Sequence, residues 1–343
     1  MNRDFDAVLA KLKDEHTTLT FDTLSELSDL TRTQRGEFSA AWPGIGLARR
    51  RDIIKTLVGT TEHNIEFDFN AIFRRALEDE DAEIRATALF GLWEDEHADL
   101  LGPLLHLLKS DPDEQVRERA AESLGRFILA GELGELDMPS AFAVQETLLQ
   151  VYNDPNESVN VHCHVLESLA YSGDDAIGDL IEAAYYSQDE RLTHAALIAM
   201  GHSADPFWES ILLQELDSPR PELRFEAAQS CGMLELAQAV HTLGEMAQTD
   251  EDAEVRAMAI WALGQIGDTE ARRIINTLLE LGGGEDDEIE FIRDALLEAQ
   301  EEIAFQDDAL DMAYFGDSTD DLWDDFESEE DIEDDELFDP PEE

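Results

Sequence analysis

The stretch from Asp250 to Leu279, DEDAEVRAMAIWALGQIGDTEARRIINTLL, constrains the fold more than any other part of the chain. Acidic residues at its start predict a turn, and two segments with apolar residues at helical spacing follow. Gly264 and Gly267 stand where the first helix should end. One such unit leaves an apolar face uncovered, so the stretch predicts a repeating stack of helices.

Related units recur along the chain. An apolar residue returns early in one helix of each unit at intervals of about 31 to 36 residues, with one interval of about 45. These anchors are Ile84, Val116, Val161, Leu192, Leu223, Val255 and Phe291. A small or compact residue, such as Ala88 or Ala120, follows one helical turn later, where neighbouring helices must approach closely. The sequence therefore predicts an all-α fold, a right-handed α-solenoid of about seven helix pairs.

The ends of the chain depart from this pattern. Residues 1–64 contain short amphipathic segments without the repeat, which predicts an irregular helical N-terminal cap. We expect the repeats to occupy residues 65–304. Residues 305–343 are acidic and contain no Lys or Arg, which predicts a disordered acidic tail.

The pattern of turn, Asp, apolar-Arg, Ala-Ala and Leu-Gly, over roughly Phe67 to Glu302, resembles HEAT repeats and especially the short HEAT-like repeats associated with phycobilisome lyases. The resemblance implies a stacked ladder of acids and arginines in the turns between helices. Its members would be Asp81, Arg85, Asp113, Arg117, Glu222, Arg224, Asp252 and Arg256. His162, Thr193 and Ile292 replace the arginine in three units, so the ladder should be interrupted there. Arg50 is expected to lie outside it.

Charge limits the partners. The formal net charge is -59 at pH 7, which argues against nucleic acid and anionic membranes, since both require basic protein surfaces. We expect a protein partner, with a basic protein as the natural complement, and a chain that is monomeric in isolation. Two cysteines without disulfide-framework spacing, and no apolar run suited to a signal peptide or a membrane span, predict a cytoplasmic location.

No catalytic, cofactor or metal site is predicted. His162 and His164 are two apart on a presumed helix and point in different directions, so they cannot share an ion. We therefore expect a non-catalytic protein-binding scaffold or assembly factor. Two alternatives stay open: a lyase- or hydroxylase-type enzyme or enzyme subunit that uses the histidine-rich middle repeats, and a chaperone-like shield for a basic protein.

The binding surface is expected on the face of the second helices opposite their core stripe, from the third to the sixth unit. Of its sixteen positions only Glu167 and Glu226 are charged, in a chain that is 31% charged. Such a low-charge strip is typical of a peptide groove, unless curvature buries it. The residues proposed to bind protein are His164, Tyr171, His194, Ile198, His202, Phe225, Gln229, Met233, Met258, Trp261 and Gln265.

The acidic tail contains apolar side chains at intervals. Leu322, Trp323 and Phe326 have the composition of a short docking motif, which could bind a partner or the groove itself. The alternative is a solubilising tail with incidental aromatic residues.

Overall fold

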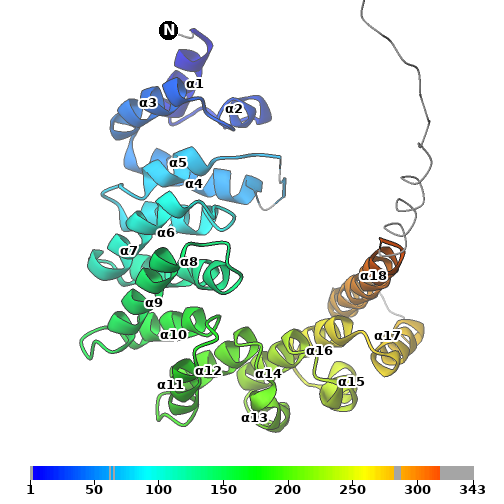
Figure 1. Cartoon of the computed structure of the whole chain (residues 1–343). Coiled ribbons are helices and arrows are strands. Elements are labelled where there is room, and N and C mark those ends of the chain that lie inside the picture. The colour runs from blue at the N-terminus through cyan, green and yellow to red at the C-terminus, as the bar shows by residue number, and fades with distance from the viewer. Residues whose placement is uncertain (1–2, 62, 65, 282–286, 317–343) are drawn as a thin grey trace, which may run out of the picture. The chain divides into compact units, whose positions relative to one another are not determined.

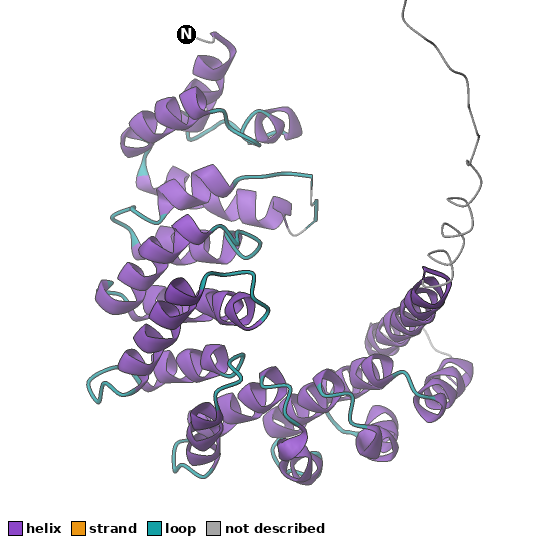
Figure 2. Ribbon diagram, in the orientation of Figure 1, coloured by secondary structure: helices purple, strands orange, loops and turns teal. Residues whose placement is uncertain are grey.

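The computed structural model describes residues 3–61, 63–64, 66–281 and 287–316. Within these ranges the chain forms α-helices and short 3-10 helices joined by loops, with no strand, which confirms the all-α prediction (Figure 2). None of the described helices is long and apolar enough to cross a membrane. The chain divides into two compact units, Met1–Leu234 and Glu235–Glu343, which we describe separately.

The first unit is built from helix pairs stacked one upon the next (Figure 1). Its elements are α1 (Arg3–Lys13), α2 (Phe21–Ser25), α3 (Arg32–Ala41), η1 (Trp42–Gly44), α4 (Leu47–Thr61), α5 (Asn70–Ala76), α6 (Ala82–Gly91), η2 (Ala98–Leu100), α7 (Leu101–Ser110), α8 (Glu114–Glu132), α9 (Met138–Tyr152), α10 (Val159–Leu169), α11 (Asp175–Tyr185), α12 (Glu190–His202), η3 (Pro206–Trp208), α13 (Glu209–Glu215) and α14 (Pro221–Met233).

Two layers run through this unit. The even-numbered helices from α4 to α14 pack against one another in succession, and α5, α7, α9, α11 and α13 each pack against the even-numbered helix that follows. The even-numbered helices approach closely because small residues such as Ala88, Ala120 and Ala196 are fully buried between them. A Cβ on Gly201 would lie 2.6 Å from the Ser230 hydroxyl, so α12 and α14 can meet there only at a glycine.

Three of the four acids at the predicted ladder positions begin helices, whereas α14 begins after Arg220 with Glu222 in its first turn. The Asp81 side chain accepts a hydrogen bond from the backbone N–H of Ile84 at 3.2 Å, and Asp113 and Asp252 cap α8 and α16 (Ala253–Ile266) in the same way. Each carboxylate thus occupies a helix N-terminus, where the free N–H groups and the helix dipole favour negative charge.

Arg85 and Arg117 of the ladder reach the next repeat unit of the stack. Arg85 donates to both carboxylate oxygens of Asp111 at 2.7 and 2.8 Å, and Arg117 donates to Glu157 at 2.8 and 3.0 Å. Arg85, Arg117, Arg224 and Arg256 share a second contact, because each donates to the backbone carbonyl six positions upstream. Each of the four therefore fixes the turn before its own helix, and the first two also join consecutive units.

Arg50 belongs to this ladder, so the expectation that it lies outside was wrong. Its guanidinium is 3.2 Å from the Asp79 carboxylate, and both residues are buried. Trp42 donates its indole N–H to the same carboxylate at 2.7 Å. Because α4 packs against α6 as later even-numbered helices do, the stacking begins before residue 65.

In the third and fourth repeat units, whose sequences lack the ladder arginine, another side chain makes the contact with the preceding turn. His162 Nε2 lies 3.1 Å from the Asp154 carbonyl, and the Thr193 hydroxyl donates to the Tyr185 carbonyl at 3.3 Å. Each replacement still contacts the turn before its own helix. Neither side chain has the guanidinium fork needed to grip a carboxylate of the next unit with two hydrogen bonds.

The second unit contains η4 (Ala237–Ala239), α15 (Val240–Thr249), α16, α17 (Thr269–Leu281) and α18 (Asp287–Gly316), with α16 packed against the other three α-helices. The predicted anchor Phe291 is 46% exposed, whereas Leu296, Ala299 and Ile303 are buried. The expected register of the last unit was therefore wrong by one position, and Ile292 is not the ladder substitute we expected. In the shifted register Arg293 follows the anchor Ile292, as an arginine follows Ile84 and Val116, and a helical period of 3.6 leaves adjacent registers hard to distinguish from the sequence.

The predicted start of a disordered tail at residue 305 was also wrong, because α18 continues to Gly316. The Gln306 side-chain amide donates to the Gln265 carbonyl at 3.2 Å, near the end of α16. Extending an existing helix requires little free energy, and Gln306 supplies a donor to a helix-end carbonyl. Residues 317–343, with the proposed motif Leu322, Trp323 and Phe326, lie outside the described residues.

Candidate functional site: a groove along the even-numbered helices

Three neighbouring hollows lie along the even-numbered helices of the first unit, with volumes of about 270, 430 and 840 Å³. Phe90 and Arg119 line both the first and the second hollow, and Glu118 and His164 line both the second and the third. Because each hollow shares its walls with the next, the three form one groove from α6 to α14. We call this surface the groove.

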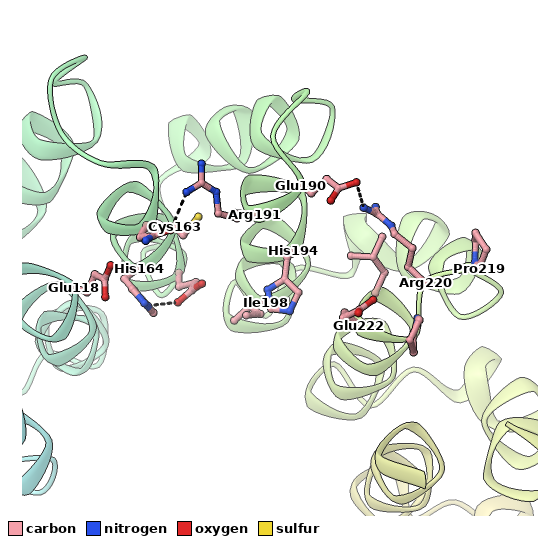
Figure 3. Close-up of a pocket in the computed structure, with 14 residues that line it drawn as sticks. Glu118, Cys163, His164, Glu190, Arg191, His194, Ile198, Pro219, Arg220 and Glu222 are labelled. Atoms are coloured by element: carbon pink, nitrogen blue, oxygen red, sulfur yellow. Dashed lines mark hydrogen bonds and ion pairs between the residues drawn. The ribbon is translucent and has the colours of Figure 1, made fainter. Parts of the chain in front are cut away.

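The largest hollow lies among α8, α10, α12 and α14, and the side chains that line it are drawn in Figure 3. His164, His194 and Ile198 line it. The sequence pattern had predicted that these three residues share one surface. Ion pairs and hydrogen bonds bridge neighbouring units, since Arg220 contacts Glu190 at 3.2 Å and Arg191 donates to Asn160 at 3.2 Å. Side chains of both charges therefore border its apolar and histidine surface.

Each of the two charged positions in the strip is paired with a histidine. His164 Nδ1 lies 2.9 Å from Glu167 on the same helix, and His194 Nε2 lies 3.1 Å from Glu226 on the next even-numbered helix. The hydrogen bond to Glu167 raises the pKa of His164, and the hydrogen bond to Glu226 raises the pKa of His194. The groove thus gains positive charge as pH falls toward the histidine range.

These pairs predict a pH-dependent contribution to stability. A histidine whose folded pKa exceeds its unfolded value of about 6.5 stabilises the fold below that value, and the contribution is lost as pH rises through the folded pKa. We expect Glu226→Gln to lower the pKa of His194 and to leave that of His164 nearly unchanged. Titration of the histidine Cε1 protons by NMR measures both. An unchanged His194 titration in Glu226→Gln would disprove the pairing.

An aromatic stack lies farther along the groove. The rings of Tyr171 and His202 are parallel to within 16° with centroids 4.4 Å apart, and His202 Nδ1 lies 3.0 Å from the Glu167 carbonyl. Tyr171 also lines the smallest hollow. The stack therefore forms a half-buried wall between units rather than two independent surface side chains.

The rest of the predicted strip is partly accessible. Phe225 and Gln229 on α14 are half-buried and Met233 is exposed. Met258, Trp261 and Gln265 are half-buried on α16, in the second unit. None of the eleven predicted residues is fully buried, so their side chains are not sealed against each other.

Arg126 is the groove residue that the sequence did not reveal. Its repeat position matches Tyr171 and His202, but the strip positions of the first two repeat units hold an ordinary solvated mixture of residues. In the structure its Nε and Nη2 are shielded from solvent and have no hydrogen-bond partner among the described residues. Only the arrangement of neighbouring side chains shows that this arginine, unlike Arg119, has no ion pair with a carboxylate among the described residues.

Neither cysteine is suited to nucleophilic chemistry. Cys163 and Cys231 are buried, and burial raises the pKa of each thiol to about 12. Both thiols are therefore protonated at neutral pH, and the thiolate is the reactive form. Among the described residues, no three His, Cys, Asp or Glu side chains come together as a metal site.

A family model described as HEAT repeats matches residues 70–137 and 209–301. The chain is a HEAT-repeat protein. It is 30% identical over 179 residues to a HEAT repeat-containing taxis protein of Halobacterium salinarum, a match that covers 52% of this chain and 37% of that relative. The HEAT-repeat chain thus spans little more than a third of the relative's length.

Solved structures with similar helical repeats include the complex of CpcE and CpcF of phycocyanin lyase from Nostoc sp. PCC7120, at 21% identity and a TM-score of 0.47, covering 81% of this chain and 94% of that one. Human deoxyhypusine hydroxylase has 18% identity and a TM-score of 0.34, and the match covers 88% of this chain and 96% of that one. At these identities the similarity concerns the fold alone.

Proposed function

We propose that this HEAT-repeat protein is a non-catalytic scaffold that binds a segment of a partner protein in the groove. The observation that carries the proposal is the continuity of three hollows along five even-numbered helices, α6 to α14. Exposed or half-exposed apolar side chains border them, including Phe90, Trp93 and Ile198. Apolar and aromatic surface within a polar rim is the usual composition of protein-binding sites.

The protonated cysteines favour a binding role over a lyase with a cysteine nucleophile, because neither thiol is activated. The large negative charge supports a partner that is basic outside the bound segment, since long-range attraction would speed association. The same negative charge supports solubility at high salt concentration and a monomeric state in isolation. We also propose that the protein is cytoplasmic.

The taxis relative suggests where such a scaffold acts. We propose that the partner belongs to the machinery that controls directed movement. Residues 138–208 lie between the two segments matched by the family model, and they contain His164, Tyr171, His194, Ile198 and His202. The groove therefore includes the units that depart most from the general repeat, as expected if they recognise one particular partner.

The test introduces one charge into the groove. Ile198→Glu should reduce capture of the native partner by about tenfold or more, because a carboxylate would be buried in the apolar part of the interface. Affinity capture from the source organism with quantitative mass spectrometry measures this, and a strain carrying the same variant should lose directed movement.

The matched control is Tyr186→Glu, since Tyr186 is 66% exposed at the end of α11 in the other layer. It adds the same charge outside the groove and should leave capture unchanged. Equal capture by wild type and a folded Ile198→Glu variant would reject the groove as the binding site.

A further inference from the structure

Arg126 carries an uncompensated charge at the end of the groove formed by α6 and α8. Its guanidinium is largely withdrawn from solvent, and burial lowers the pKa of Arg126. Neither Nε nor Nη2 has a hydrogen-bond partner among the described residues. Arginine stays protonated even so, and a buried guanidinium without an anion is unfavourable. The free protein thus holds an arginine with two shielded donor nitrogens that make no hydrogen bond among the described residues.

Two of the nearby carboxylates, Glu122 and Asp95, are already occupied, and the exposed Glu96 attracts Arg126 without a hydrogen bond to its Nε or Nη2. Glu122 receives the guanidinium of Arg119 at 2.7 Å, and Asp95 is held by Arg74 at 2.6 and 2.8 Å. Asp95 is buried, so it is not free to turn toward Arg126. The charge on Arg126 therefore remains available for an anion from outside.

The walls around Arg126 are largely apolar, although Arg119, Glu122 and Ser123 also line the hollow. Phe90, Trp93, Leu129 and Tyr171 line the same hollow, and Trp93 is 56% exposed. The Phe127 ring lies 5.0 Å from the Arg126 guanidinium carbon. At about 270 Å³ the hollow is smaller than the usual range for ligand pockets, so it suits one or two side chains rather than a cofactor.

We propose that the Arg126 pocket binds the carboxylate of a partner segment in which Asp or Glu stands next to an aromatic or large aliphatic residue. The guanidinium offers two parallel N–H donors, which match a carboxylate, while Trp93 and Leu129 contact the neighbouring apolar side chain. This deepens the proposed function by naming one feature of the bound segment. The carboxylate would fix the register of the segment in the groove.

A fluorescein-labelled peptide containing Leu-Trp-Asp-Asp-Phe tests the proposal with the full-length protein. The chain itself carries this sequence at residues 322–326, so the probe has an acid-aromatic composition natural to the protein. Fluorescence anisotropy should show saturable binding of this peptide. The matched peptide with both Asp residues replaced by Asn should bind at least about tenfold more weakly, since it lacks the charge that pairs with Arg126.

Two variants separate recognition from folding. Arg126→Met should abolish the preference for Asp over Asn and should leave the melting temperature unchanged or raised, because it removes a buried charge without a partner. Arg273→Gln removes the same charge from an exposed arginine and should bind like wild type. A marked loss of melting temperature in Arg126→Met would show a structural role and overturn the proposal.

Equal affinity for the Asp and Asn peptides, or an Asp preference that survives in Arg126→Met, would also overturn the carboxylate assignment. So would the absence of saturable binding. Partner capture by wild type and by Ile198→Glu is measured independently of peptide binding. Loss of capture in Ile198→Glu would therefore still support the groove if the carboxylate assignment failed.

Discussion

Arg85→Ala is expected to lower the free energy of unfolding by about 3–5 kcal/mol, the usual loss when one partner of a buried ion pair is removed. The Arg85 and Asp111 side chains are only 9% and 3% exposed, so the substitution leaves a carboxylate buried without its cation. It also removes the donor to the Asp79 carbonyl. Urea unfolding followed by circular dichroism measures the loss.

Arg119→Ala is the matched control for the ladder. Arg119 lies on the next even-numbered helix and pairs with Glu122 at 2.7 Å, but the two side chains are 45% and 49% exposed. An exposed pair of this spacing contributes about 0.5 kcal/mol or less. Similar losses from the two substitutions would show that the Arg85 contact does not stabilise the junction between units.

Salt is expected to raise the melting temperature of the full chain by roughly 10 °C between low salt and about 1 M KCl. A formal net charge of -59 makes the folded chain repel itself, and the screening length falls from about 30 Å at 0.01 M to about 3 Å at 1 M salt. Several kcal/mol of relieved repulsion is enough for such a shift in a protein of this size.

Differential scanning calorimetry over a KCl series measures this shift. Sucrose at matched osmolality is the control, because an uncharged solute does not screen charge. A melting temperature that stays constant or falls with KCl would contradict a stability limited by self-repulsion.

The repeat pattern predicted most of the fold because its information is local. Ile84, Val116 and Val255 are buried as their spacing indicated. The errors arose where the pattern weakened: Phe291 was assigned one position from the buried face, and α18 continued past residue 304. Hydrogen bonds such as that of Gln306 to α16 depend on helix packing, which periodicity does not encode.

The groove was predicted in part. The shortage of charged residues indicated the surface that holds His164, His194 and Ile198, because an exposed face with little charge is unusual in so acidic a chain. The sequence pattern did not predict the side-chain contacts between repeat units. Arg50 was excluded from the ladder because its partner Asp79 lies in the next unit, and Arg126 was overlooked because its lack of a partner depends on the side chains around it.

Site-specific photocrosslinking measures the central claim most directly. A photoreactive phenylalanine analogue would be placed at Ile198 in the groove and, in a separate chain, at Tyr186 in the opposite layer, with both proteins expressed in the source organism. The groove account predicts that position 198 crosslinks to one partner protein, reproducibly and with loss of signal in the presence of excess unlabelled chain, while position 186 does not. Crosslinking of that partner from position 186 and not from position 198 would contradict it.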